Sequence, residues 1–290
     1  MIISRIKQKL TLNVRRHSYG WSRRRTIRSK FEKEQVFSYP KTLICGFGIV
    51  GKHLKEEFKF AETYDPDADM KADYLQPPNK KYDVVFIAVP TPDNNGKCDT
   101  KYVEQAISQV NADIYILKST VPPTTTDELA ERFNKHILFS PEYYGATQFA
   151  NAGGDFVILG GDDYSYKKIR QMYQLIKKAD FTIYRVKNTE AEIIKYMENC
   201  YLGLKVIFCN QFKDIADLYG VSYDAIRDGF VLDKRVGKSH TFVYDDYRGY
   251  DSKCLNKDIP AIITAIKERG YNKKFIMEDV DSINRMYRGW

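Results

Sequence analysis

Two kinds of segment alternate along the first two thirds of the chain. Residues 82–89 and 113–118 are continuous apolar runs rich in β-branched side chains, which is typical of strands buried on both faces. The pattern predicts further strands from Leu43 and at 62–64, 137–139, 156–159 and 181–184, with helices at 50–60, 100–110, 127–134 and 164–178. Strands that alternate with short helices predict a parallel, doubly wound α/β sheet.

The pattern changes after residue 187. Thr189 and Glu192 have the spacing of a capping box, and apolar residues then recur at helical intervals as far as Gly220. The spacing predicts one helix over 189–219, of about 30 residues, which is well beyond the mean for globular proteins. Shorter helices are predicted at 223–227, 257–269 and 275–287. A helix this long usually spans a domain boundary or a subunit interface. We therefore expect an α/β domain at 41–187 and an all-helical domain at 188–290.

Composition is compatible with this organisation. The chain has 290 residues, of which 43% are hydrophobic, enough for one large or two medium-sized cores. No apolar run approaches the roughly 20 residues that a membrane-spanning helix needs, so we expect a soluble protein. The five cysteines are widely spaced, with no CxxC pair and no His at zinc-binding spacing. This usage predicts reduced cysteines, a cytoplasmic location and no metal site.

The positive charge is concentrated at the start of the chain. The net charge is +8, but residues 1–41 hold 12 Lys and Arg against two Glu, so the remainder carries −2. The near-neutral net charge of the residues after 41 is not typical of a nucleic-acid-binding domain. Three interpretations of a basic extension at 1–40 stay open: a solvated arm, a patch for nucleic acid or an anionic membrane, and an Arg-rich targeting segment.

A glycine-rich turn follows the first predicted strand. In Gly46-Phe47-Gly48-Ile49-Val50-Gly51, the first glycine permits the turn, the second admits a pyrophosphate, and the third lets the helix pack on the strand. The backbone at Ile49 and Val50 then forms a helix N-terminus that faces the anion. Asp65 follows Gly46 at about the spacing of 20 residues that ribose recognition requires, which favours NAD over NADP. A glycine-rich turn of an unrelated α/β domain is the alternative.

Several polar residues come directly after predicted strands. Ligands of doubly wound sheets bind outside the carboxyl ends of the strands, so we expect Thr91, Ser119, Thr120 and Glu142 to converge on the rim that carries the glycine turn. For each hydroxyl taken alone, a role in a turn or a helix cap is the more common alternative.

The helical part contains two further candidates for chemistry. Lys195 and Asn199 share one face of the long helix, where a buried ammonium beside a carboxamide polarises a substrate oxygen. An exposed polar stripe is the alternative. Cys254 lies near Lys253 and Lys257 at a predicted helix N-terminus, a setting that lowers the pKa of a thiol, and it is the best nucleophile candidate.

At this point the motifs together resemble the UDP-glucose/GDP-mannose dehydrogenase family, whose members oxidise the primary alcohol of a nucleotide sugar to a carboxylate with two NAD. The resemblance covers residues 42–287. Its motifs are the glycine turn, Val89-Pro90-Thr91-Pro92, Lys118-Ser119-Thr120-Val121-Pro122, Pro141-Glu142, Thr189 to Asn199, Asp233-Lys234-Arg235-Val236-Gly237, and Cys254 with Lys257-Asp258.

The resemblance implies roles by position. Cys254 would attack the aldehyde that the first hydride transfer forms, and the resulting thiohemiacetal would be oxidised to a thioester that water hydrolyses. It implies UDP-glucose as the substrate and UDP-glucuronate as the product. Lys195 and Asn199 would stabilise oxyanions, and Asp258 and Glu142 with Thr120 would orient or deprotonate water. Arg235 would contact the nucleotide sugar across a homodimer interface formed by the helix 189–219.

This sequence departs from the family pattern at three points. Pro141-Glu142 continues as Tyr143-Tyr144-Gly145-Ala146, and Gly249 is the only glycine left in the approach to the cysteine, where backbone contacts the substrate. The resemblance ends before the family's third, nucleotide-binding domain, so we expect that its contacts with the nucleotide either come from a separate chain or are lost. Two alternatives stay open. One is a two-domain dehydrogenase of the hydroxyisobutyrate type, which also uses a Lys-x-x-x-Asn pair, and the other is a catalytically degraded NAD-binding or interaction protein.

Overall fold

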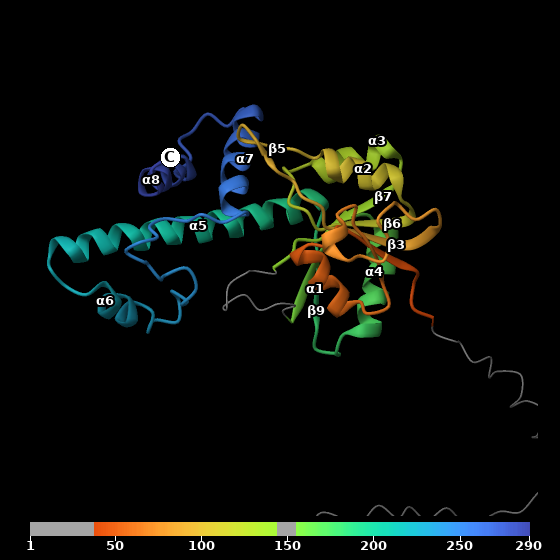
Figure 1. Cartoon of the computed structure of the whole chain (residues 1–290), viewed down its shortest axis with the longest axis horizontal. Helices are drawn as coiled ribbons and strands as arrows, with labels where there is room; N and C mark the ends of the chain where they lie inside the picture. The colour runs from red at the N-terminus through yellow and green to blue at the C-terminus, as the bar shows by residue number, and fades with distance from the viewer. Residues whose placement is uncertain (1–37, 144–154) are drawn as a thin grey trace, which may run out of the picture. The chain divides into compact units, whose positions relative to one another are not determined.

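The computed structural model describes residues 38–143 and 155–290, and residues 39–290 belong to one compact unit (Figure 1). The basic extension at 1–40 lies almost entirely outside the described residues, so its three interpretations stay predictions. The departure at Tyr144-Gly145-Ala146 also lies outside them. The division into domains at residue 187 stays a prediction as well.

A parallel sheet of five strands forms the centre of the α/β part. Its order is β2 (Glu62–Tyr64), β1 (Thr42–Cys45), β3 (Lys81–Ile87), β6 (Asn111–Leu117) and β7 (His136–Phe139). Val85 of β3 lies opposite Leu43 of β1 on one side and Tyr115 of β6 on the other. The predicted parallel, doubly wound fold is confirmed. The strand order reverses between β1 and β3, which is where such sheets bind their ligands.

Alternate side chains of the central strands point to opposite faces of the sheet and pack into two separate apolar cores. Leu43 and Val85 pack with α2 (Lys101–Gln109) and α3 (Thr125–Phe133), which cover one face of the sheet. Ile44 packs on the other face with α1 (Ile49–Glu57) and α4 (Asp163–Ile176) (Figure 1). Period-two alternation along strands that are buried on both sides therefore explains why these runs are apolar throughout.

The remaining strands form small sheets of their own. Strands β8 (Phe156–Leu159) and β9 (Thr182–Arg185) pair in parallel outside the five-stranded sheet, although their backbone meets it where Gly160 N–H donates to Phe139 O at 2.8 Å. The sequence analysis missed the hairpin β4 (Asp93–Asn94) and β5 (Lys97–Cys98), because two-residue strands are too short to show a period. A short 3-10 helix, η1 (Ala68–Met70), follows β2.

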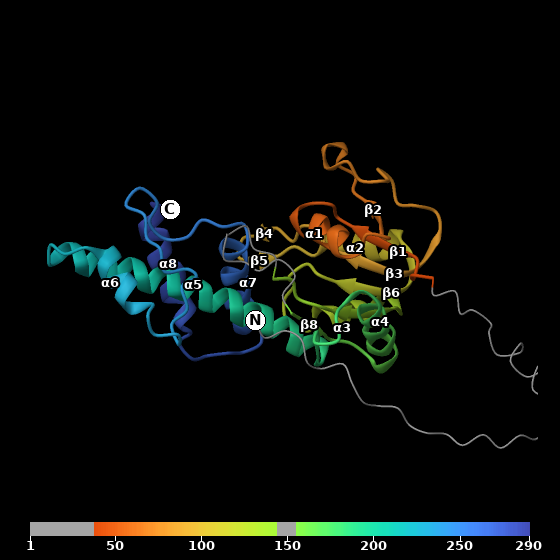
Figure 2. The same ribbon diagram turned by 90° about the horizontal axis from the view of Figure 1, so that it is seen from below.

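The helical part is built on α5 (Asn188–Leu218), which is 31 residues long. In both views α5 runs from beside the sheet past α7 (Leu255–Glu268) towards α6 (Tyr223–Phe230), and α8 (Ile276–Arg288) lies next to α7 (Figures 1 and 2). Side chains of α5, α7 and α8 share one apolar core that includes Tyr196, Ile259 and Met277. None of the helices within the described ranges is both long and apolar enough to cross a bilayer.

The predicted capping box at Thr189 and Glu192 is wrong. Helix α5 begins one residue earlier, and the Glu190 carboxylate accepts the Lys187 N–H at 2.7 Å. Glu192 is fully buried and faces a different element. Its carboxylate accepts the N–H groups of Thr124 (2.7 Å) and Thr126 (2.8 Å) and the Thr126 hydroxyl (2.6 Å), at the N-terminus of α3. The spacing of Thr189 and Glu192 matches a cap at the start of their own helix, whereas the Glu192 side chain caps the N-terminus of another helix, α3.

Asn188 makes a second connection between α5 and the sheet. Its side-chain oxygen accepts the Phe139 N–H at 2.7 Å, and its amide donates to Ile137 O and Asp127. A Cβ at Gly160 would lie only 2.5 Å from the Asn188 oxygen, so glycine is required for this close approach. Asn188 and Glu192 together fix the start of α5 against β7 and α3.

The Glu192 contacts lead to a stability prediction. Replacing Glu192 with Ala leaves two buried N–H groups and a hydroxyl without an acceptor, and we expect a loss of about 2–4 kcal/mol in the free energy of unfolding. Urea titrations monitored by circular dichroism measure this loss. Glu190→Ala, which removes an acceptor at the exposed helix start, is the control and should lose about 1 kcal/mol or less. Equal losses in the two variants would show that Glu192 does not secure α5 to α3.

Candidate active site

The glycine turn has the geometry expected for each of its three glycines. Gly46 has a φ of +89°, and a Cβ there would lie 2.4 Å from Ala88 O. A Cβ at Gly51 would lie 2.0 Å from Gly46 O, so only glycine lets α1 pack this closely. At Gly48, by contrast, a Cβ would have no neighbour within 4 Å. The first and third glycines are therefore required by the fold, and the second borders open space.

The N-terminus of α1 is suited to an anion. No side chain caps it and its first turn contains no acidic residue, so the N–H groups at Ile49 and Val50 are not neutralised by the chain itself. Asp65, which follows β2, accepts the Phe47 N–H of the turn at 2.7 Å. This bond holds a carboxylate at the edge of the turn. The residues present thus fit a dinucleotide, with its pyrophosphate at Gly48 and a ribose at Asp65.

The strand-end hydroxyls lie together, as their topology predicts, but they bond to the protein's own backbone. The Ser119 hydroxyl donates to Val89 O at 2.7 Å, and the Thr91 hydroxyl donates to Thr120 O at 3.0 Å. Cys98 Sγ lies 3.6 Å from the same Thr120 oxygen. These bonds join the ends of β3 and β6, which is the turn role given above as the alternative. Contact of Thr91, Ser119 and Thr120 with a cofactor stays a prediction.

Lys195 occupies a buried, negatively charged position. Its side chain is 7% exposed, which excludes the exposed polar stripe, and its Nζ lies 3.1 Å from a Glu198 oxygen and 3.7 Å from a Glu142 oxygen. The Tyr143 ring centroid is 5.3 Å from Nζ. Burial acts to lower the pKa of Lys195, but Glu142, Glu198 and Asp258 outweigh burial and the pKa is raised. Lys195 is therefore a protonated ammonium at neutral pH.

Asn199 links α7 to the face of α5 that carries Lys195. Its Nδ2 donates to Asp258 Oδ2 at 2.6 Å, and both side chains are almost fully buried. Lys257 Nζ lies 2.5 Å from the other oxygen of Asp258. The Asp258 carboxylate, in the first turn of α7, is thus held between a carboxamide and an ammonium.

Cys254 precedes α7 directly and belongs to the same group of charges. The residue is exposed, but desolvation around the sulfur, Asp258 and Glu142 raise the pKa of the thiol, and Lys257 and Lys195 only partly oppose this. The sequence analysis expected a lowered pKa from the neighbouring lysines and the helix N-terminus. That expectation is wrong because burial of the sulfur raises its pKa most, and the nearby carboxylates of Asp258 and Glu142 raise it further.

Two predicted substrate-binding residues lie outside this group. Arg235 is highly exposed and its guanidinium pairs with Asp233. Gly249 has a φ of +74° and donates its N–H to Asn210 Oδ1 at 3.0 Å, so its backbone is occupied within the fold. Contact of either residue with a substrate stays a prediction.

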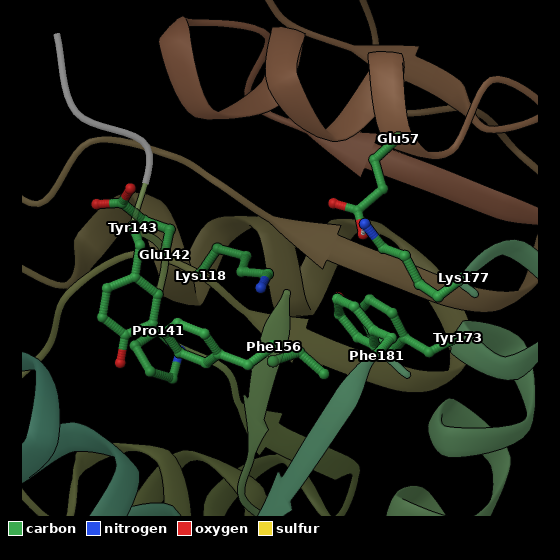
Figure 3. Close-up of a pocket in the computed structure, with 10 residues that line it drawn as sticks. Glu57, Lys118, Pro141, Glu142, Tyr143, Phe156, Tyr173, Lys177 and Phe181 are labelled. Carbon is green, nitrogen blue, oxygen red and sulfur yellow. Dashed lines mark ion pairs between the residues drawn. The ribbon is translucent and has the colours of Figure 1, made fainter. Parts of the chain in front are cut away.

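A pocket on the other side of Glu142 contains residues that the sequence analysis did not assign. Lys118 points into it, between Glu142 and Tyr143 on one side and the Glu57–Lys177 ion pair (2.8 Å) on the other (Figure 3). Lys118 Nζ donates to the Ser140 hydroxyl at 2.9 Å. Burial lowers the pKa of Lys118 to about 8; Glu57 and Glu142 raise it and Lys177 lowers it further.

Glu198 was also missed, although helical spacing could have revealed it. It stands three residues after Lys195, which places the two side chains on the same face of a helix. The contact between the Tyr143 ring and Lys195 has no comparable signal in the sequence, because it depends on how the segment after β7 packs against α5. Within the described residues, no group of His, Cys, Asp and Glu side chains has the arrangement of a metal site.

Comparison with known proteins identifies both parts of the chain. Residues 59–177 match the NAD binding domain of the UDP-glucose/GDP-mannose dehydrogenase family, and residues 189–286 match the central domain of that family. The first match begins after the glycine turn, so the interpretation of the turn depends on its own geometry.

Curated relatives carry related names. The UDP-glucose 6-dehydrogenase of Pseudomonas aeruginosa is 30% identical over 214 residues, covering 67% of this chain and 47% of that protein. The UDP-N-acetyl-D-mannosamine dehydrogenase of Methanocaldococcus jannaschii is 31% identical over 163 residues, covering 51% of this chain and 38% of that protein. The chain spans about half the length of the curated relatives it matches.

A solved structure supports the fold. The structure of a UDP-glucose dehydrogenase from the archaeon Pyrobaculum islandicum superposes with a TM-score of 0.72 at 21% identity, covering 88% of this chain and 69% of that one. At this identity the likeness establishes the architecture alone.

The buried ammonium of Lys118 leads to a pH prediction. Its folded-state pKa of about 8 lies below the ordinary value of 10.5, so above pH 8 the folded protein binds fewer protons than the unfolded chain. Lys118 should therefore contribute a rise in the free energy of unfolding between about pH 8 and 10, opposite in sign to the contribution of Cys98 and Cys200, whose pKa values are raised by burial. Lys118→Met should abolish this rise and stabilise the protein at pH 7 by about 1–3 kcal/mol. Urea denaturation from pH 7 to 10 measures both effects.

The exposed Lys52 provides the control for this experiment. The Lys52→Met variant should keep the pH dependence of stability that the unmodified protein shows above pH 8. If Lys118→Met retained the same pH dependence as the unmodified protein, the interpretation of Lys118 as a destabilised buried ammonium would be incorrect.

Proposed function

Because the chain belongs to the UDP-glucose/GDP-mannose dehydrogenase family, we propose that it oxidises the primary alcohol of a nucleotide sugar to a carboxylate with NAD. The observation that carries the proposal is the group formed by Lys195, Asn199, Asp258, Glu142 and Cys254. These residues come from α5, from α7 and its start, and from the end of β7, and they meet at one place. An ammonium, a carboxamide, two carboxylates and a thiol are the groups that a two-step oxidation to an acid needs.

The glycine turn would hold the cofactor. NAD accepts a hydride from the carbon that is oxidised, and it must be exchanged once within each turnover. In the proposal Gly48 and the N–H groups at Ile49 and Val50 bind the pyrophosphate, and Asp65 binds a ribose. An anion site made of backbone groups leaves no charged side chain to be neutralised when the cofactor departs.

Cys254 would divide the second oxidation into two easier steps. After the first hydride leaves, the alcohol has become an aldehyde, and Cys254 Sγ forms a bond to its carbonyl carbon as the thiol proton is released. The thiohemiacetal loses a second hydride and becomes a thioester. Water then attacks the thioester carbon, the C–S bond breaks, and the carboxylate leaves with the thiol restored. Four electrons go to two NAD.

The surrounding residues would handle charge and protons. Lys195 remains protonated beside its two carboxylates, so it can stabilise the negative oxygen of each tetrahedral species. Asn199 would donate to the same oxygen while holding Asp258 in place. Asp258 and Glu142, with Thr120, would orient or deprotonate the attacking water. Because the pKa of Cys254 is raised in the free protein, one of the two carboxylates must take the thiol proton during attack.

UDP-glucose is the substrate we propose, with UDP-glucuronate as the product. The relative from Pseudomonas aeruginosa is named for UDP-glucose, and other relatives are named for UDP-N-acetyl-D-mannosamine. Both sugars present a primary alcohol at the same carbon, so the chemistry of Cys254 suits either one. In this proposal the exposed Arg235 binds the nucleotide sugar held by a second copy of the chain.

The outer face of α5 supports a homodimer. Its exposed apolar residues follow one another at intervals of three, four or seven, so they form a single stripe along the helix that continues into Tyr219 at its C-cap: Ile193, Met197, Tyr201, Phe208, Phe212, Ile215 and Leu218. Met197 and Tyr219 are 73% and 75% exposed. A continuous apolar stripe of this length is a feature of association surfaces. A second α5 crossing the first would cover the stripe and bring Arg235 to its neighbour.

A turnover experiment tests the proposed function. The protein is mixed with NAD and a panel of UDP-sugars and GDP-sugars, and NADH is followed by absorbance. We expect two NADH for each UDP-glucose consumed. Cys254→Ala should reduce turnover by at least 10²-fold, because the nucleophile is removed. Cys200→Ala removes a buried thiol that lies outside the mechanism and is the control.

Other outcomes would select the alternatives. Single-step hydride transfer to a small hydroxy acid, unaffected by Cys254→Ala, would identify a two-domain dehydrogenase of the hydroxyisobutyrate type. The raised thiol pKa is the observation in its favour, since one hydride transfer needs no thiolate. NAD binding without turnover of any substrate would identify a degraded, NAD-binding interaction protein.

The dimer is tested separately. Met197→Glu places a charge in the middle of the apolar stripe, and we expect the dimer to dissociate at least tenfold more readily in sedimentation equilibrium. Met286→Glu, at an equally exposed position on α8, should leave the association unchanged. A monomer at all concentrations in the unmodified protein would rule out the interface.

A further inference from the structure

Two buried asparagines secure the backbone that leads to Cys254. Asn210 on α5 and Asn284 on α8 are 1% and 2% exposed, and neither belongs to the group of charges around the thiol. Both contact the segment 248–250, which ends only a few residues before Cys254. The three helices α5, α7 and α8 pack on one another around this segment (Figures 1 and 2).

Asn284 pairs with Tyr250 through both of its polar groups. Its Oδ1 accepts the Tyr250 N–H at 2.7 Å, and its Nδ2 donates to Tyr250 O at 3.0 Å. The side chain thus imitates a neighbouring strand and satisfies a backbone unit that is otherwise buried. Gly249 is required beside it, since a Cβ there would lie 2.5 Å from Asn284 Oδ1. The two hydrogen bonds from Asn284 and its close contact with Gly249 restrict the position of the peptide at residue 250.

Asn210 secures the two residues before Tyr250. Its Oδ1 accepts both the Gly249 N–H at 3.0 Å and Arg248 Nε at 2.8 Å. The guanidinium of Arg248 also donates to Asn210 O at 2.7 Å and to Asp214 at 2.6 Å. The segment 248–250 is therefore bound to α5 on one side and to α8 on the other.

We propose that Asn210 and Asn284 are positioning residues that hold the segment 248–250 so that Cys254 faces Lys195, Asn199 and Asp258. Neither asparagine touches the reacting atoms. They act through Gly249 and Tyr250, whose fixed backbone determines where the chain enters α7 and thus where the sulfur lies. The family pattern places several glycines in this approach, whereas this chain has one. A segment with fewer glycines and two asparagine contacts is rigid in one conformation.

The structure also explains why α7 can approach α5 at this level. A Cβ at Gly203 would lie 2.6 Å from Ile259 Cδ1 and 3.6 Å from the Tyr250 ring. The glycine therefore makes room for both the first turns of α7 and the side chain of Tyr250. In the proposal, the close helix approach and the two asparagines together determine where α7 begins, and therefore where Cys254 lies.

The thiol itself provides a test that needs no enzyme activity. Iodoacetamide alkylation of Cys254 is followed by peptide mass spectrometry, with the rate in the unmodified protein as the reference. Asn284→Ala and Asn210→Ala should each alkylate Cys254 at least threefold faster at pH 8. Their pH profiles should shift to lower pH, because the released sulfur is more hydrated and lies farther from Asp258 and Glu142, and these effects outweigh the loss of Lys195 and Lys257 as neighbours. Ser282→Ala, an exposed change on α8, should leave the rate unchanged.

The effect on turnover rests on the proposed function. If the chain oxidises nucleotide sugars, both asparagine variants should lose at least tenfold in kcat with unchanged affinity for NAD. If it oxidises none of them, the proposed function fails while the alkylation contrast still decides the positioning role. Unchanged alkylation of Cys254 in variants that fold and bind NAD would overturn that role.

A milder substitution covers the case in which the alanine variants do not fold. Asn284→Asp keeps an oxygen for the Tyr250 N–H and loses the donor to Tyr250 O. It should show an intermediate rate of Cys254 alkylation, between the unmodified protein and the faster rate expected on release. A rate equal to that of the unmodified protein would contradict the proposal.

Discussion

One buried face of a single helix holds the candidate active site together. The residues at 188, 192, 195, 199, 203 and 210 of α5 recur at helical intervals on the side that packs against the rest of the chain. The first two bond to the sheet and to α3, the next two meet Glu142 and Asp258, and the last two accommodate α7 and the segment before Cys254. Because the helix is continuous, these contacts share one rigid element.

This arrangement explains how two separately built parts form one site. The sheet contributes a glycine turn and Glu142 at the carboxyl ends of its strands, and the helices contribute Lys195, Asn199 and Asp258. Buried polar groups need partners, and here each part supplies the partners of the other. Glu192 and Asn188 are structural members of this set, and they are as deeply buried as the residues proposed for catalysis.

The electrostatics of the site keep Lys195 protonated and disfavour the thiolate form of Cys254. Two carboxylates beside Lys195 keep it protonated, and carboxylates close to Cys254 oppose loss of the thiol proton. Such a site is prepared in advance to stabilise a negative oxygen. In the proposed reaction the nucleophile would form only as the aldehyde is attacked, which would limit side reactions of a free thiolate. The positions of Asn210 and Asn284 then matter, because a thiol with a raised pKa depends on its placement for reactivity.

Local patterns in the sequence determined the strands of the central sheet, the main helices, the roles of Gly46 and Gly51, and the common face of Lys195 and Asn199. These follow from backbone hydrogen bonding and sterics that repeat every two or 3.6 residues. Only the tertiary structure decided that Glu192 binds α3 instead of capping its own helix. It also decided that Glu142 lies beside Lys195, that Asn199 holds Asp258, and that the pKa of Cys254 is raised. The three contacts depend on distances between residues far apart in the chain, which are set by helix packing at positions such as Gly203 and have no local signature. The raised pKa of Cys254 follows mainly from burial of its sulfur, which the same packing produces.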